Sequence, residues 1–137
     1  MNSGEQLIVD LVRAALPDVV AVYLFGSRTR PQDLRADSDW DIAVLAAGGG
    51  VPPMTWFDLK MGLTRALNVV RVDLVDLKRS NYVIRETVLT DGELLYDGDE
   101  VARLRWEYAS EKLMAEWRPA YEESSRAVMR RLDEFAA

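Results

Sequence analysis

The sequence predicts an α/β (α+β) fold in which a small mixed sheet is flanked by helices and followed by a helical C-terminal tail. Two patterns predict this fold. Short apolar runs of strand length alternate with longer segments whose apolar residues recur every three or four positions, as on one face of a helix. From residue 99 onward only the helical pattern remains, so the sheet is expected to end before it.

The individual elements follow from apolar spacing and from turn residues. The expected strands are 19–25, 39–44, 72–77 and 93–98, and the expected helices before the tail are 3–16, 55–67 and 80–91. Ser3 and Gln6 have the spacing of a capping box, and Ser80 is the expected N-cap of the third helix. Pro119 is expected to divide the tail into two helices, because a proline inside a helix costs about 3 kcal/mol.

One glycine-rich stretch separates the second strand from the second helix. Residues 46–53 contain three glycines and two prolines, a composition typical of a flexible linker. A phosphate-binding P-loop is disfavoured here, because its lysine and its strand-to-helix context are missing.

Composition narrows the possible chemistry. With 137 residues, the chain is expected to form one domain with a real core. It contains no Cys and no His, which excludes disulfides, thiolate or His-ligated metal sites, and Ser-His or Cys-His catalysis. Any reaction must therefore use carboxylates, hydroxyls, Lys or Arg. The net charge of −6 argues against direct nucleic-acid binding, which requires a basic surface.

Hydropathy predicts a cytoplasmic protein without a membrane partner. No apolar run approaches the roughly eighteen residues that a membrane-spanning helix requires. The N-terminus also lacks the basic-then-apolar pattern of a signal peptide.

Candidate site residues gather between the first two expected strands. Gly26 and Ser27 follow the first apolar run, and Asp39 and Asp41 open the second strand. Because side chains alternate along a strand, the two carboxylates point to one face while Trp40 points to the core. Like charges this close repel unless a cation lies between them, and oxygen ligands suit a hard cation such as magnesium. Gly26 permits close approach of a phosphate and Ser27 offers it a hydroxyl, so a metal–triphosphate site is predicted.

Other charged residues extend or compete with this set. Asp37 with Asp39 is an alternative pair of the same spacing and parity. Asp73 lies inside an apolar strand, where a charge is costly unless it is paired or metal-bound. Asp76 has the opposite parity at the end of that strand, which predicts a turn or ion-pair residue. Arg28 lies in the short helix expected after the glycine, where it would add positive charge for phosphates.

These motifs resemble a known signature. Gly26-Ser27, eleven intervening residues and Asp39-x-Asp41 look like the signature of the polymerase-β-like nucleotidyltransferase superfamily. The whole chain resembles the minimal nucleotidyltransferase (MNT) group, whose members serve as antitoxins beside HEPN ribonuclease toxins. The resemblance implies a domain at residues 1–98 and a helical extension at residues 99–137 within the same globular unit.

The resemblance also resolves the choice of carboxylates. It favours Asp39 with Asp41 over the pair that includes Asp37, and it implies that Asp73 is the third carboxylate of the site. The sequence departs from the family pattern at two positions. Pro31 stands where relatives often have glycine, and Trp40 is bulkier than the usual aliphatic residue.

The implied reaction is Mg²⁺-dependent transfer of AMP from ATP to a hydroxyl, most simply a tyrosine, of a cognate HEPN toxin. The implied catalytic and metal-binding residues are Asp39, Asp41 and Asp73, which would hold two Mg²⁺ ions, and the implied phosphate-binding residues are Gly26, Ser27 and Arg28. Modification would neutralise the toxin, with which the protein would form a hetero-oligomer.

Two other functions remain open at this point. The protein could be a non-catalytic antitoxin that occludes its toxin, or a small-molecule nucleotidyltransferase of the aminoglycoside-modifying kind. Only a helical tail follows the core, whereas enzymes of the latter kind carry a substantial extra domain for their substrate, so a protein acceptor is favoured. The tail is amphipathic, and packing on its own core and docking on the partner are both compatible with that pattern.

Overall fold

The computed structural model describes residues 1–30 and 39–136. The chain divides into two compact units, residues 1–104 and residues 105–137. The first unit contains every strand among the described residues, and the second is the greater part of one long helix. The predicted boundary between residues 98 and 99 stays a prediction.

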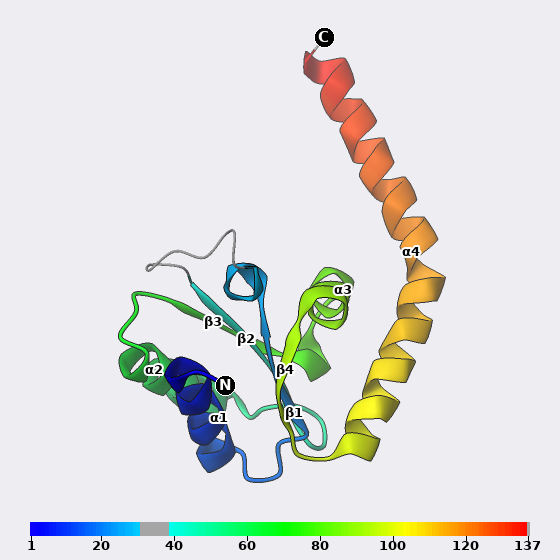
Figure 1. Cartoon of the computed structure of the whole chain (residues 1–137). Helices are drawn as coiled ribbons and strands as arrows, with labels where there is room; N and C mark the ends of the chain where they lie inside the picture. The colour runs from blue at the N-terminus through cyan, green and yellow to red at the C-terminus, as the bar shows by residue number, and fades with distance from the viewer. Residues whose placement is uncertain (31–38, 137) are drawn as a thin grey trace. The chain divides into compact units, whose positions relative to one another are not determined.

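A mixed sheet forms the centre of the first unit (Figure 1). Its strands are β1 (Ala21–Phe25), β2 (Trp40–Leu45), β3 (Val72–Asp76) and β4 (Glu93–Asp97), in the spatial order β3-β2-β1-β4. β1 runs antiparallel to both β2 and β4, while β2 and β3 are parallel. The predicted fold class and the four predicted strands are confirmed.

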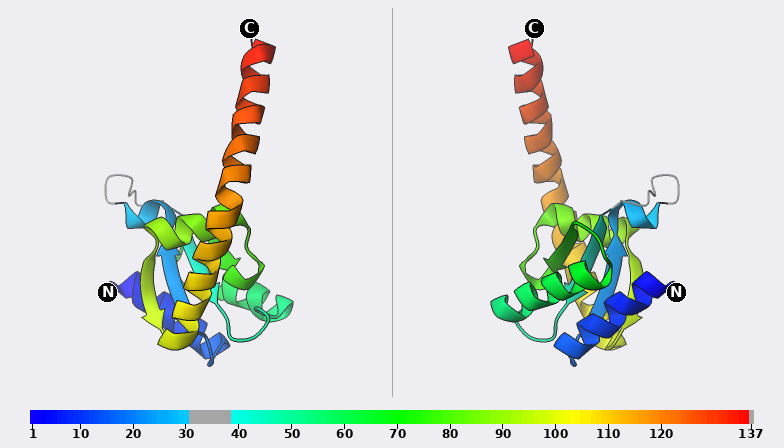
Figure 2. Two further views of the ribbon diagram at one scale, coloured as in Figure 1. Left: turned by 90° about the vertical axis from the view of Figure 1, so that its right-hand side faces the viewer. Right: turned by 90° about the vertical axis from the view of Figure 1, so that its left-hand side faces the viewer.

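Helices cover both faces of this sheet. α1 (Ser3–Ala15) and α2 (Pro53–Ala66) pack together on one face, and α3 (Tyr82–Asp91) lies on the other (Figures 1 and 2). Two short 3₁₀ turns follow strands: η1 (Gly26–Thr29) after β1 and η3 (Leu77–Arg79) after β3.

The N-caps of α1 and α3 differ by one residue from the prediction, and α2 begins two residues before its predicted start at residue 55. Asn2, rather than Ser3, caps α1: its side chain accepts the backbone N–H of Glu5 at 2.9 Å, and the Glu5 carboxylate accepts the Asn2 N–H at 3.1 Å. Asn81, rather than Ser80, caps α3 by accepting the Ile84 N–H at 3.0 Å. Asparagine and serine cap helices about equally well, so residue type alone does not choose between the two neighbouring positions.

The main core lies between the sheet and the α1–α2 layer. Trp40, Ile42 and Val44 of β2 all belong to this core, as their alternation predicts. The remaining buried members come from the two helices, the other strands and the segments that join them: Ile8, Val12, Val19, Val22, Leu24, Ala46, Val51, Leu59, Leu63, Val72 and Leu74. Residues of opposite parity, such as Asp41, therefore face the α3 side of the sheet.

The glycine-rich segment is an anchored turn, so the prediction of a flexible linker is wrong. The Lys78 ammonium donates to the carbonyl of Gly48 at 2.8 Å, and the Arg79 guanidinium donates to the carbonyl of Val51 at 3.2 Å. The backbone N–H of Val51 donates to the Asp76 carboxylate at 2.8 Å. Asp76 also forms an ion pair with Arg79 at 3.8 Å, which confirms it as a turn and ion-pair residue.

The tail is one helix, α4 (Glu100–Ala136), and the predicted break at Pro119 is wrong. A proline removes a single N–H from the helical ladder, and a helix can absorb that loss by bending locally. The start of α4 is tied to the first unit, because Arg103 forms an ion pair with Asp97 of β4 at 3.1 Å. In the described part of the chain, no helix has the length and apolar character needed to cross a membrane.

Candidate active site

Two of the predicted carboxylates are direct neighbours across the sheet. In the parallel register of β2 and β3, Asp41 pairs with Asp73. Paired residues on adjacent strands project to the same face, which here is the face opposite the Trp40 side chain. Asp39 directly precedes β2, is exposed and has the same parity as Asp41. The register therefore brings together carboxylates that are more than thirty residues apart in sequence.

The carboxylates interact strongly with one another. The pKa of Asp41 is raised from 3.8 to about 6, first because the half-buried side chain loses hydration. A side-chain hydrogen bond with Asp73 and the negative charges of Asp73 and Asp39 raise it further, whereas the charge of Arg71 lowers it. The surroundings of Asp41, including the neighbouring Asp73, therefore oppose its ionisation.

Arg71 is a part of the site that sequence reasoning missed. Its Nε donates to Oδ1 of Asp73 and its terminal nitrogen Nη2 donates to Oδ2, both at 3.1 Å. Interaction with Asp73 also raises the pKa of Arg71 above its ordinary value. The available signal was the spacing, because residues two apart in an extended segment point to the same side.

Gly26 is required by the position of Asp41. Its φ is +76°, a conformation that residues with a side chain rarely adopt. A Cβ added there would collide with Oδ2 of Asp41 and would lie 2.9 Å from its Cγ. The glycine thus lets the turn after β1 pass directly over the carboxylate, a packing reason beyond the predicted approach of a phosphate.

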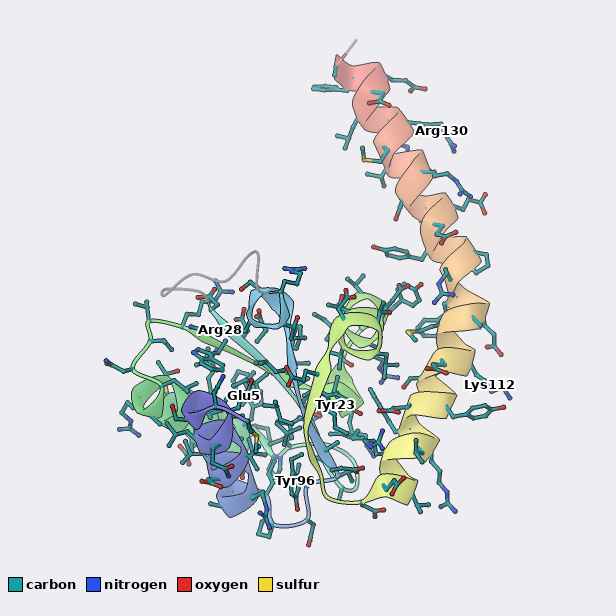
Figure 3. All side chains as sticks on the ribbon, viewed as in Figure 1. Glu5, Tyr23, Arg28, Tyr96, Lys112 and Arg130 are labelled. Carbon is teal, nitrogen blue, oxygen red and sulfur yellow. The ribbon has the colours of Figure 1, made fainter. Side chains whose placement is uncertain are left out.

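The η1 turn holds the remaining predicted residues. Ser27 is half-buried within it, and the Thr29 hydroxyl donates to the Gly26 carbonyl at 2.7 Å. Arg28 is labelled in Figure 3. Its guanidinium carbon lies 4.2 Å from the ring centroid of Trp40. Because Trp40 projects to the core face, this placement does not direct Arg28 toward the Asp41–Asp73 pair.

Two predicted features lie outside the described residues. Asp37, the alternative partner of Asp39, and Pro31, the departure from the family pattern, both fall in the undescribed segment 31–38. The structure therefore describes the Asp39–Asp41 pair but not the alternative pair of Asp37 with Asp39.

The carboxylates of this site are the chemical type of ligand that a hard divalent cation binds. The neighbouring carboxylates raise the pKa of Asp41, and carboxylate oxygens are the ligands that Mg²⁺ prefers. The described side chains nevertheless contain no group of three or more acidic or other metal-binding residues arranged to hold a metal ion. Asp73 directs both of its oxygens to Arg71.

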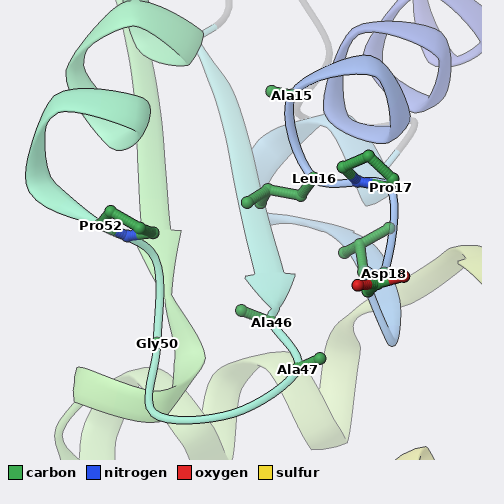
Figure 4. Close-up of a pocket in the computed structure, with 9 residues that line it drawn as sticks. Ala15, Leu16, Pro17, Asp18, Ala46, Ala47, Gly50 and Pro52 are labelled. Atoms are coloured by element: carbon green, nitrogen blue, oxygen red, sulfur yellow. The ribbon is translucent and has the colours of Figure 1, made fainter.

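Two hollows in the surface lie elsewhere. A cavity of about 260 Å³ opens at the other end of the sheet, between the α1–β1 loop and the glycine-rich turn, near Leu16, Asp18 and Ala46 (Figure 4). A second, of about 430 Å³, lies between α1 and α2. None of the predicted site residues lines either of these two cavities.

Comparison with known proteins places this fold and site in a family. Residues 7–101 match the family described as Polymerase beta, Nucleotidyltransferase. The chain belongs to this family. The match spans all four strands, so it includes Gly26, Ser27 and the carboxylates Asp39, Asp41 and Asp73.

Individual relatives are more specific. The chain is 39% identical over 93 residues to the protein adenylyltransferase MntA of Shewanella oneidensis, a match that covers 68% of this chain and 65% of that protein. A solved structure of a tri-AMPylated HEPN toxin from the same organism in complex with its MNT antitoxin matches with a TM-score of 0.75 and 28% identity, over 92% of this chain and 96% of that one. A toxin–antitoxin crystallised with AMP-PNP matches with a TM-score of 0.67 and 28% identity, over 97% and 98%.

Proposed function

We propose that this protein is an MNT-type antitoxin that transfers AMP from ATP to a hydroxyl of a HEPN ribonuclease toxin. The observation that carries the proposal is the pairing of Asp41 with Asp73 beneath the Gly26 turn, within a nucleotidyltransferase fold. The similarity to a protein adenylyltransferase and to an antitoxin bound to an AMPylated toxin supports the donor and the kind of acceptor.

Asp39, Asp41 and Asp73 are the residues that would hold Mg²⁺, with two ions between them. Bound Mg²⁺ would offset the charge of the triphosphate and lower the pKa of the acceptor hydroxyl. Donors of the required kind stand on adjacent strands, and the raised pKa of Asp41 indicates a cluster that a cation would stabilise.

The other predicted residues would position the nucleotide. Gly26 and Ser27 would hold the phosphates of the leaving pyrophosphate through backbone N–H groups and the Ser27 hydroxyl. Arg28 would add positive charge after turning away from Trp40. The acceptor oxygen then bonds to the α-phosphorus while the bond to pyrophosphate breaks, and the hydroxyl proton passes to the Asp73 carboxylate. Phosphoryl-type transfer depends on positioning and charge rather than on covalent catalysis, so the absence of His and Cys is no obstacle.

A protein acceptor fits the architecture. The carboxylate pair lines neither of the two cavities described above, and an acceptor that brings its own surface needs no pocket. We propose a tyrosine of the toxin as the modified residue and the cytoplasm, where ATP is available, as the place of the reaction.

Occlusion without catalysis is the second candidate. The side-chain arrangement favours it in one respect, since Asp73 is bound to Arg71 and no described set of acidic residues is arranged for a metal. Mass spectrometry of the co-expressed toxin separates the two functions. Catalysis predicts a mass gain of whole AMP units that is lost with Asp41→Asn, while that variant still binds the toxin. An unmodified toxin that is nevertheless inhibited would favour occlusion.

A further inference from the structure

Arg71 makes an unusual contact for a residue beside a candidate metal site. Both oxygens of Asp73 accept hydrogen bonds from one guanidinium, at 3.1 Å each. The Arg71 side chain is 64% exposed, so apart from this contact with Asp73 little of the protein surrounds it. Bidentate contacts of this kind are the strongest form of arginine–carboxylate pairing.

The charge of Arg71 acts on the whole cluster. It interacts favourably with Asp39 and Asp41 as well as with Asp73. Arg71 therefore supplies positive charge at the place where a divalent cation would supply it.

A guanidinium and a divalent cation compete for the same oxygens. The guanidinium occupies one acceptor site on each oxygen of Asp73, and its positive charge repels a cation at the sites that remain, so the two compete for this carboxylate. We propose that Arg71 is an exchangeable counter-ion, which occupies Asp73 until a divalent cation displaces it and so sets the cation concentration at which the site loads. This inference rests on the metal-binding role proposed above for Asp39, Asp41 and Asp73.

The opposite role for Arg71 makes the opposite prediction. If Arg71 instead orients Asp73 for the metal, its removal would weaken metal binding. If Arg71 displaces the metal, its removal strengthens binding. The sign of the change in affinity therefore distinguishes competition from positioning.

The test is a titration of the full chain with Mn²⁺ alone. Binding is measured by calorimetry and by the electron paramagnetic resonance signal of free Mn²⁺. Arg71→Gln is expected to lower the Mn²⁺ dissociation constant about two- to fivefold, the range that an exposed ion pair accounts for. Arg71→Lys keeps the charge but loses the two-point contact, and is expected to fall between wild type and Arg71→Gln. Arg65→Gln, an equal change of charge on the exposed surface of α2, is expected to match wild type.

The outcomes separate this inference from the proposed function. An unchanged or higher dissociation constant for Arg71→Gln, with wild-type binding that Asp41→Asn abolishes, overturns the counter-ion role and leaves the metal site standing. Wild-type Mn²⁺ binding that survives Asp41→Asn overturns both. Should Arg71→Gln fail to fold, weaker Mn²⁺ binding by Arg71→Lys than by wild type overturns the counter-ion role equally.

Discussion

Replacing Asp41 with asparagine is expected to stabilise the metal-free protein while abolishing AMP transfer. The pKa of Asp41 is raised from 3.8 to about 6, so its charged form is disfavoured in the folded chain. Asparagine removes that charge and keeps the shape of the side chain. A pKa difference of this size corresponds to at most roughly 3 kcal/mol. Asp41 is only half-buried, and solvent screening reduces the expected gain to about 1 kcal/mol.

The pH dependence of the gain in stability expected for Asp41→Asn identifies its cause. Since the folded pKa of about 6 lies above the unfolded value near 3.8, the folded chain binds more protons between these pH values. The contribution of Asp41 to stability therefore falls as pH rises from about 4 to 6, and stays low above that. Asp41→Asn should gain its full advantage at pH 7 and lose it near pH 4.

Urea denaturation in EDTA at pH 4, 5.5 and 7 measures this directly. The control is Asp58→Asn, which makes the same chemical change at an exposed position on α2 and is expected to change stability by less than about 0.5 kcal/mol. An Asp41→Asn variant that is no more stable than wild type at pH 7, or whose advantage is undiminished at pH 4, would refute the electrostatic account of this cluster.

Three further substitutions test separate parts of the structure. Gly26→Ala should abolish AMP transfer and lower stability by about 1–3 kcal/mol, because its φ is positive and a Cβ would displace Asp41; transfer at the wild-type rate would contradict this. Asp76→Ala should lower the unfolding free energy by about 2 kcal/mol, since the buried Val51 N–H loses its acceptor, while toxin modification persists; an unchanged melting temperature would argue against an anchored turn. Phe135→Glu, at an exposed apolar position of α4, should weaken co-purification of the toxin without altering AMP-PNP binding by calorimetry; undiminished co-purification would remove this face from the interface.

Local patterns predicted the strands and the direction of their side chains. Trp40 points to the core and Asp41 to the opposite face, as the sequence indicates, because a strand has a period of two. Alternation cannot say which strands are neighbours, however. The placement of Asp73 beside Asp41 came from family resemblance, and the parallel pairing of β2 and β3 accounts for it.

The missed features all depend on contacts between distant or flexible groups. The glycine-rich turn is anchored by side chains about thirty residues further along the chain. The composition of the turn itself contains no sign of these distant contacts. Arg28 stacks on Trp40 and Arg71 binds Asp73, and the rotamers of long side chains are set by such tertiary partners. The break predicted at Pro119 rests on the average free-energy cost of a proline inside a helix, which a long helix can absorb by bending.

The core and the site are linked through one strand register. Ile42 pairs with Leu74 on the face covered by α1 and α2, immediately beside the Asp41–Asp73 pair on the opposite face. A slip of one residue between β2 and β3 would turn the apolar side chains of one strand away from the core and bury a carboxylate in it. Burying each of these apolar side chains contributes roughly 1.5–3 kcal/mol, more than the cost of about 1 kcal/mol expected for the charge on Asp41. The apolar face is therefore what holds two repelling carboxylates side by side.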